Sequence, residues 1–396
     1  MLAGLTLVAL LALGGGGGGG DAHPVPLPGS FMVGSTFDGT QLPGFAGQVY
    51  PKQPAFQWSY CEERCIAMPA PAGCPEECAF RIAGNRDTTF AVPRELDVQT
   101  HTMGEACYEN QQFSSVQEYT DYTVHVHSHH GWFSSHSSRT EKFYNRYFEH
   151  DDSMSLMYRK LSYYDVEVLE ILAELHPDFK GAVANLPATN TTSARDAYRS
   201  FVNAYGTHYM HRARMGGMLL QESFFHSCLL MQYKSQSVYE QSSSSFLGII
   251  HDDKDSGKGS NITNAMWQKW SSQNVTMIGG FTDKFPVPTR DEPWEKGTLQ
   301  DWMDTVKFSP LPVQYEVRPL TDLIDDKAKV ALLTDAIMDY SAEVRRMNKD
   351  AASEFAKKDP FTKPSWCTYG GGPHPPTGYV PDPVVTRDDL PGCPSW

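Results

Sequence analysis

The stretch TSARDAYRSFVNAYGTHYMHRARMGGML, residues 192–219, constrains the fold more than any other part of this chain. Its first half predicts a helix, because apolar residues recur there at the three- and four-residue spacing of one helical face. Ser193 is expected to cap the N-terminus, with Asp196 three residues later in a variant of the capping box. Gly206 is expected to end the helix, since glycine tolerates the left-handed backbone of a helix C-terminus.

The second half of this stretch predicts a strand that is interrupted by two adjacent glycines, Gly216 and Gly217. Glycine has no side chain to pack and opens backbone conformations that other residues avoid. A glycine pair therefore weakens a strand and permits a sharp bend or a bulge.

The residues around this helix end fit the pattern Y-G-T-H-[F/Y]-x6-G-G at every specified position. The matching residues are Tyr205, Gly206, Thr207, His208, Tyr209, Gly216 and Gly217. The stretch resembles the signature of the membrane attack complex/perforin (MACPF) domain family, and so many residues at fixed spacing rarely match by chance. The alternative is a helix–turn–strand that merely looks alike.

The resemblance extends over roughly residues 30–345, most of the chain. LHPDFKGAVANLP, at 175–187, looks like the family's short helical segment upstream of the signature. Three segments resemble the downstream half of the family: VTMIGG with a second glycine pair, Gly279 and Gly280, LQDWMDTV with Trp302, and VRPLTDLI. FMVGSTFDG and FAVP are similar to its N-terminal strands, more weakly.

This resemblance implies an α+β fold like that of the cholesterol-dependent cytolysins. Its core is a bent, twisted four-stranded antiparallel sheet flanked by two helical clusters, which unfurl into amphipathic β-hairpins on oligomerisation. By position the clusters map to about 126–150 and 228–274. Candidate membrane-inserting residues are Val124, Val126, Trp132, Phe133, Phe246, Leu247, Ile249 and Ile250, with ordinary core packing as the alternative. Gly216 and Gly217 would then form a hinge, or else a static bulge that needs glycine for packing.

Other segments predict further elements of the fold. HDDSMSLMYRKLSYYDVEVL and MLLQESFFHSCLLMQY, at 218–233, are typical of strands. The Ser- and Gly-rich region that follows is ambiguous between helix and strand, as expected of a segment that refolds from one to the other. Residues 325–357 predict a helix, because Val330, Leu333, Ile337 and Tyr340 share one face.

Length and composition bound the function. The chain has 396 residues, 40% of them hydrophobic, which suits one large globular domain with appendages. Its net charge of −14 argues against nucleic acid as a partner and against electrostatic capture by anionic lipid. We expect a signal peptide at 1–22, a MACPF domain at 24–345 with a cysteine-rich insertion at 58–80, and a helix end with a Pro/Gly-rich extension at 346–396.

The N-terminus favours export. Residues 2–13 are apolar, and Gly20 and Ala22 are the small residues expected before a cleavage site. The apolar run is too short to span a bilayer. We therefore expect a secreted, soluble monomer that converts to a membrane-inserted oligomer.

Export permits disulfides and glycans. Cys61, Cys65, Cys74 and Cys78 are expected to pair among themselves, with a zinc site as the alternative. The remaining cysteines are expected to pair as Cys367 with Cys393 and Cys107 with Cys228. Sequons for N-glycosylation begin at Asn190, Asn261 and Asn274.

The histidines raise separate hypotheses. His208 is interpreted as a core histidine rather than a catalytic base, because no nucleophile or carboxylate partner stands beside it in the sequence. HVHSHH, residues 125–130, is similar to the zinc motif HxHxDH of metallo-β-lactamase-like hydrolases. Three interpretations of His125, His127 and His129 stay open: a metal site, a pH-sensitive patch and a solvated strand face.

The favoured function is a secreted perforin-like pore former that binds a target-cell membrane and oligomerises into a ring of identical copies. The alternative is a non-lytic MACPF protein in adhesion, signalling or defence, because glycans at Asn261 and Asn274 would be costly to carry across a membrane. A zinc-dependent hydrolase is a distant alternative. The favoured function requires no enzyme activity, cofactor or metal.

Overall fold

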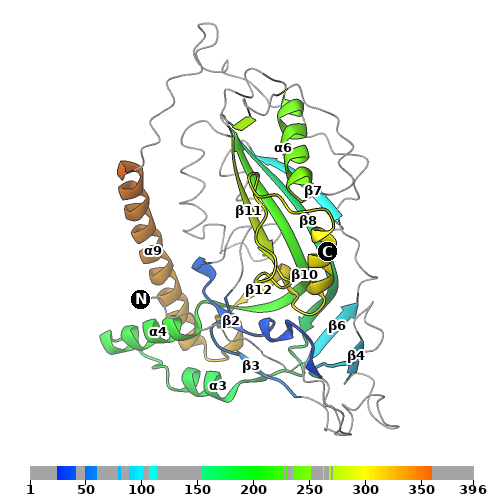
Figure 1. The fold of residues 1–396 in the computed structure, drawn as a ribbon. Helices are drawn as coiled ribbons and strands as arrows, with labels where there is room; N and C mark the ends of the chain where they lie inside the picture. Colours follow the sequence, from blue (N-terminus) through cyan, green and yellow to red (C-terminus); the bar gives the residue numbers. More distant parts are fainter. Residues whose placement is uncertain are drawn as a thin grey trace.

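The computed structural model describes residues 25–41, 50–59, 79–81, 89–100, 107–113, 153–225, 229, 233, 235–250, 262, 267–268 and 271–358. Figure 1 shows long, twisted strands at the centre of the molecule, with helices at and below their lower end and one helix against their upper end. The fold is α+β with a mainly antiparallel sheet, as predicted.

Two long antiparallel strands form the centre of the sheet. β8 (Ser153–Val168) and β10 (His208–Phe225) pair from Arg212 with Glu167 to Phe225 with Ser153. All but one of the β10 residues are buried, so this strand lies in the interior of the fold. The half of the sheet that holds residues 208–216 of β10 is called the lower half below, and the rest the upper half.

Each side of this central pair is completed by two shorter strands placed end to end. On the β8 side, β6 (Leu96–Thr100) pairs the lower half and β7 (Cys107–Phe113) the upper half. On the β10 side, β12 (Leu311–Pro319) pairs the lower half and β11 (Ser271–Ile278) the upper half. Four strands therefore lie side by side in each half, β6, β8, β10 and β12 in the lower one and β7, β8, β10 and β11 in the upper one, as in the predicted four-stranded sheet.

The helices divide between the two halves. α3 (Pro177–Ala184), α4 (Thr192–Tyr205) and α9 (Lys327–Lys358) lie at the lower end, where α4 and α9 pack side by side (Figure 1). α8 (Thr298–Val306) packs against β10, and α6 (Ser235–Ile249) lies against the upper half. Within the described residues, no helix combines the length and apolarity needed to span a membrane.

Short elements complete the described chain. They are β1 (Val25–Pro26), η1 (Ser30–Met32), β2 (Thr36–Phe37), η2 (Gly39–Gln41), β3 (Phe56–Gln57), β4 (Ala79–Arg81), β5 (Thr89–Ala91), β9 (Glu174–Leu175) and η5 (Leu320–Leu323). β2 pairs with the start of β10, so the N-terminal part of the chain lies beside the signature residues.

Several local predictions are confirmed and others need correction. The helix at α9 is confirmed, with Leu333 and Ile337 fully buried on the predicted face. α4 is capped by Thr191, whose hydroxyl accepts from the Ala194 backbone N–H at 3.1 Å, so the prediction of Ser193 as cap was wrong. The strand predicted to 233 ends at Phe225.

Candidate functional site

The signature glycines lie where the sheet changes partners. Gly216 is the last β10 residue paired with β12, and Met218 is the first paired with β11. The pairing of β10 with β8 shifts register between Met215 and Gly216. β10 is therefore continuous rather than interrupted. The residue left unpaired at this register shift is Tyr163 of β8, so the irregularity lies in the partner strand opposite the glycine pair.

Both positions of the signature pair require glycine because there is no room for a side chain. Neither residue has a positive φ, so the left-handed backbone is not the reason for glycine here. A Cβ on Gly216 would collide with the backbone carbonyl oxygen of Leu161 in β8. A Cβ on Gly217 would lie 2.7 Å from Val306 Cγ2 and 3.2 Å from Trp302 Cη2 of α8.

The second glycine pair meets the first. Gly279 and Gly280 have φ angles of 74° and 71°, which side chains rarely tolerate. A Cβ on Gly279 would collide with the carbonyl oxygen of Gly216, and one on Gly280 would lie 2.6 Å from Trp302 Nε1. The Trp302 indole N–H donates to the Gly279 carbonyl at 3.2 Å. We call these four glycines the glycine joint, since backbones from β10 and the end of β11 meet there without intervening side chains.

The first signature residues fasten α4 to the N-terminal strand. Gly206 ends the helix at φ 81°, as predicted, and a Cβ there would collide with the Phe37 carbonyl. The Thr207 N–H donates to that same carbonyl at 2.9 Å. Tyr205 packs its ring against Phe201, with 4.9 Å between centroids. The glycine is therefore needed both for the turn and for the close approach of β2.

Thr207 and His208 form a buried polar pair. The Gly39 N–H donates to Thr207 Oγ1 at 2.8 Å, which leaves the hydroxyl hydrogen to donate to His208 Nδ1 at 2.7 Å. Burial lowers the pKa of His208 to about 3, so the ring stays neutral. This environment fits the core histidine expected from the sequence.

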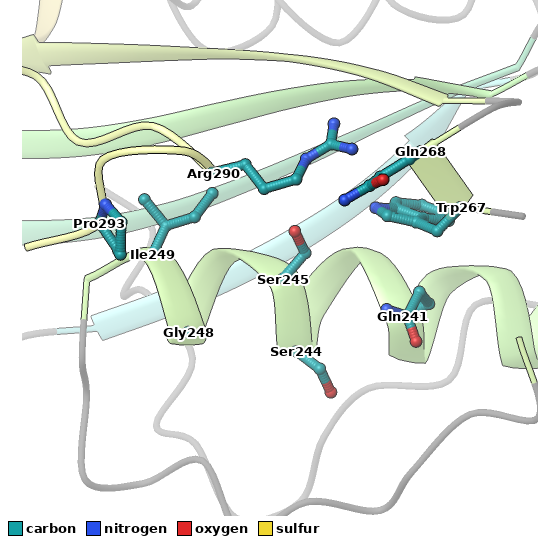
Figure 2. Close-up of a pocket in the computed structure, with 9 residues that line it drawn as sticks. All are labelled: Gln241, Ser244, Ser245, Gly248, Ile249, Trp267, Gln268, Arg290 and Pro293. Atoms are coloured by element: carbon teal, nitrogen blue, oxygen red, sulfur yellow. The ribbon is translucent and has the colours of Figure 1, made fainter. Parts of the chain in front are cut away.

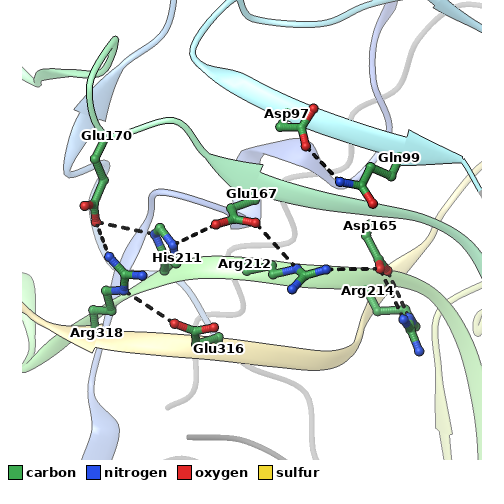
Figure 3. A network of polar contacts seen from close by, with 10 residues as sticks. All are labelled: Asp97, Gln99, Asp165, Glu167, Glu170, His211, Arg212, Arg214, Glu316 and Arg318. Carbon is green, nitrogen blue, oxygen red and sulfur yellow. Dashed lines mark hydrogen bonds and ion pairs between the residues drawn. The ribbon is translucent and has the colours of Figure 1, made fainter. Parts of the chain in front are cut away.

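A network of charged side chains crosses the lower half of the sheet (Figure 3), and no local sequence pattern predicted it. Arg214 of β10 binds Asp165 of β8 through two hydrogen bonds of 2.9 and 3.1 Å, and both side chains are buried. Arg318 of β12 lies 2.9 Å from Glu170, which also accepts the Tyr209 hydroxyl at 2.5 Å. These contacts tie β8, β10 and β12 together.

His211 sits inside this network. Its Nε2 lies 3.2 Å from Glu167 Oε1, and its Nδ1 lies 3.4 Å from Glu170 Oε1 without forming a hydrogen bond. Burial, and then the Arg318 guanidinium, lower the pKa of His211 in spite of the two carboxylates. The lower half is therefore held by charge pairs around a histidine that prefers to be neutral.

Two segments leave the upper end of the sheet. Residues 114–152 connect β7 to β8, and residues 226–270 connect β10 to β11. The second predicted insertion segment, 228–274, was too long, because 271–274 already pair with β10. The first excursion is longer than the predicted 126–150.

The second excursion contains α6. Its candidate inserting residues are buried in the hydrophobic core: Phe246, Leu247, Ile249 and Ile250. Near the start of α6, Val238 and Tyr239 are buried in a second apolar cluster with Phe225 of β10. Between these two apolar contacts the interface is polar, since the Gln221 amide donates to the Ser242 carbonyl at 3.3 Å and the Ser242 hydroxyl donates to Ser155 at 3.4 Å. Serines fill buried positions of this helix, which explains why its sequence did not read clearly as helical.

Other predicted site residues fall outside the described residues or their described side chains. These are Val124, Val126, Trp132, Phe133, His125, His127, His129, Asn261 and all eight cysteines. Asn190 and Asn274 are described and exposed. Among the described residues, no group of three or more His, Cys, Asp or Glu side chains is arranged to hold a metal ion.

The bent antiparallel sheet, with a glycine joint at its centre and two excursions at one end, is the arrangement expected of the MACPF family. The family model described as MAC/Perforin domain matches residues 55–350, well over half of the chain. The chain belongs to this family. Perforin-like pore formation is one role within the family, and its pore formers are not enzymes.

Individual relatives agree with this assignment. Perforin-1 of Rattus norvegicus is 26% identical over 42% of this chain and 32% of its own length. The perivitellin-2 67 kDa subunit of Pomacea canaliculata is 24% identical over 42% of this chain and 28% of its own length. The chain thus spans about a third of these relatives. GNIP1Aa from Chromobacterium piscinae shares the fold, with a TM-score of 0.58 and 15% identity over 81% of this chain and 57% of its own.

Proposed function

We propose that this chain is a secreted perforin-like protein that binds a target membrane, oligomerises and inserts β-hairpins as a pore. One observation carries the proposal: both excursions leave the same end of the sheet, each between two neighbouring antiparallel strands. Phe113 of β7 pairs with Met154 of β8, and Phe225 of β10 pairs with Ser271 of β11. Each pair is the last rung of a ladder from which a hairpin can grow.

Extension of these ladders has a physical basis. A membrane-crossing strand needs roughly 9–11 residues, so a hairpin needs about 20, and both excursions are longer than that. Backbone groups inside lipid must be hydrogen-bonded, and strands from several copies closed into a barrel leave none unpaired. Growth of a hairpin from an existing register would satisfy each new residue as it joins.

The contacts of α6 support its release. Ser242 of α6 is hydrogen-bonded to Ser155 and Gln221 of the sheet, and all three are buried where an ordinary core would hold apolar side chains. Such hydroxyls and amides regain hydrogen bonds to water when the helix leaves, so separation costs less than for apolar surfaces of the same area. Apolar residues anchor the helix until then, with Val238 and Tyr239 near its start and Phe246, Leu247 and Ile249 near its end.

The lower half supports the complementary role of a fixed base. A buried, bidentate ion pair such as Asp165 with Arg214 is costly to break, at about 3–5 kcal/mol when one partner is lost. The glycine joint lies between this base and the releasable upper half. We propose that it acts as the hinge, because its backbones can shift without side chains having to repack.

A disulfide between α6 and the sheet tests the proposal. The Ser155 and Ser242 hydroxyl oxygens lie 3.4 Å apart, so cysteines at both positions are within reach of a bridge. The oxidised Ser155→Cys/Ser242→Cys protein should bind liposomes and form rings but release no dye, and a reductant should restore release. The single variant Ser242→Cys is the matched control and should lyse with or without reductant. Undiminished lysis by the oxidised double variant would exclude α6 as part of a hairpin.

One specific observation favours the non-lytic alternative. Asn274 lies exposed in β11, and its amide donates to Glu222 of β10 at 3.1 Å. A glycan at this position would stand on the strand from which the second hairpin grows. If the secreted protein is glycosylated at Asn274 and the Asn274→Gln variant is equally unable to release dye from liposomes, the non-lytic function is favoured.

A further inference from the structure

A polar pocket lies beside α6, away from the glycine joint and from the charged network. Its volume is about 380 Å³, and it is bounded by α6, by Trp267 and Gln268 just before β11, and by the loop around Arg290 (Figure 2). Figure 2 shows the Arg290 side chain, the Ser245 hydroxyl, the Gln268 amide and the Trp267 indole nitrogen around the same space.

Two donors in this pocket lack partners. Trp267 is only 2% exposed, and its buried indole N–H has no hydrogen-bond partner within the described part of the chain. The Nε of Arg290 is likewise buried without a partner there. Buried donors almost always have a hydrogen-bond partner, and a buried donor without one destabilises the fold. Two such donors facing one cavity therefore indicate a missing acceptor.

The remaining polar groups of the described lining are neutral and can donate as well as accept. Ser245 Oγ accepts from the Gln273 amide at 2.7 Å, which leaves the hydroxyl hydrogen free to point into the pocket. Gln268 contributes an amide. Among the described residues that line the pocket, Arg290 is the one charged side chain and none is a carboxylate. The neighbouring Asp291 and Glu292 are exposed.

We propose that this pocket binds a phosphate-type oxyanion, with Arg290 and Trp267 as its main ligands. A guanidinium presents a fork of N–H donors that matches phosphate oxygens, and an indole can only donate. The ligand must therefore be rich in acceptors and negatively charged. The volume leaves room for more than an inorganic ion, so free phosphate and the phosphodiester of a lipid headgroup are both possible sources.

Such binding would act on α6, and this consequence rests on the proposed function. Ser245 belongs to α6, so the pocket exists only while the helix is packed on the sheet. A ligand that binds only the packed form favours it by the factor 1 + [L]/Kd, about 11-fold at ten times Kd. The oxyanion would then delay release of the second hairpin.

The test is a calorimetric titration of the full chain with inorganic phosphate and with glycerophosphocholine at constant ionic strength. At least one of the two should bind, and their relative affinity tells the free anion from the lipid headgroup. Arg290→Met should weaken binding at least 10-fold, whereas Arg290→Lys should weaken it less because the charge remains. Trp267→Phe, which removes the N–H and keeps an aromatic ring beside Phe225, should weaken binding about 3- to 10-fold.

The outcomes separate the two proposals. Absence of binding by both probes, or binding that Arg290→Met and Trp267→Phe leave unchanged, would overturn the oxyanion site. Slower dye release from liposomes in the presence of the bound probe, with no slowing for Arg290→Met, would support the coupling to α6. If the protein releases no dye under any condition, the pore-forming function fails while the titration still decides the site.

Discussion

Replacement of Gly216 by alanine should be far more harmful than a single methyl group suggests. The new Cβ would meet the carbonyl oxygen of Leu161, a backbone atom inside the β8–β10 ladder. To remove this clash, one of the two central strands must move. Overpacking destabilises the fold by about 1–3 kcal/mol, and each weakened hydrogen bond of the ladder adds a loss of about 0.5–1.5 kcal/mol. Alanine recovers about 0.5–1 kcal/mol of backbone entropy. We expect a net loss of about 2–3 kcal/mol.

Gly217→Ala should be milder and can be relieved. Its Cβ would contact the side-chain methyl Cγ2 of Val306 at 2.7 Å, and side chains yield more easily than backbone. We expect a loss of about 1–2 kcal/mol from overpacking. The double variant Gly217→Ala/Val306→Ala should recover part of it, giving a coupling energy of about 0.5–1.5 kcal/mol in a double-mutant cycle. No such relief is available to Gly216.

Urea unfolding followed by fluorescence measures these losses. Gly181→Ala is the matched control, because Gly181 lies within α3, has no atom within 4 Å of its added Cβ and should gain up to about 1 kcal/mol from helix propensity. The expected order of stability is Gly181→Ala, wild type, Gly217→Ala, Gly216→Ala. If Gly216→Ala unfolds at the same midpoint as wild type, the argument from close approach is refuted and the pair has no packing role.

Three further predictions follow from the buried polar groups. Thr207→Val should lose about 1–3 kcal/mol in chemical unfolding, because it strips His208 of a partner, whereas Thr207→Ser should stay near wild type. Asp165→Asn should lower the free energy of unfolding by about 3–5 kcal/mol, because it leaves Arg214 buried without its anion. An Asp165→Asn protein as stable as wild type would show that the ion pair does not stabilise the fold. The lowered pKa values of His208 and His211 mean that the unfolded chain binds protons which the folded chain excludes. Stability should be complete above about pH 6.5 and fall by roughly 1 kcal/mol for His208 alone between pH 7 and 5.5, as measured by urea midpoints; no change would contradict the neutral core histidine.

The pH hypothesis for the other histidines remains a separate prediction. Lysis should rise as pH falls through about 6.5 if charging the patch loosens the first excursion. Replacement of His125, His127 and His129 by glutamine should flatten that profile and leave unfolding by urea unchanged. If the triple variant keeps the wild-type profile, the patch is a solvated strand face.

Elements with a strong local signal could be predicted from the sequence. The apolar period of α4 and the glycine at its end were sufficient, because only glycine readily adopts the φ of 81° found at Gly206. The cap was misplaced by two residues because Thr191 and Ser193 both offer a hydroxyl, and periodicity cannot tell which one begins the helix. The long strand β8 and the predicted face of α9 were likewise encoded locally.

Features that depend on pairing over long distances could not be predicted. The Glu167–His211 contact joins residues 44 positions apart, and no local pattern sets the register that brings them together. The α6 helix was hidden for another reason, since Ser242 and Ser243 occupy buried positions and remove the apolar period. The glycine pair was recognised, but its dependence on space rather than on φ required the positions of Leu161 and Val306.

The contacts of the N-terminal segment have a consequence for biosynthesis. Its apolar residues Met32, Val33 and Phe37 are buried against strands made much later, and Asp38 accepts a hydrogen bond from Tyr340, 302 residues further along. At roughly 5–20 residues per second, the ribosome needs about 15–60 s to supply that partner. Throughout this interval the first segment of the nascent chain has no native place to fold, and its protection from aggregation must come from outside the polypeptide.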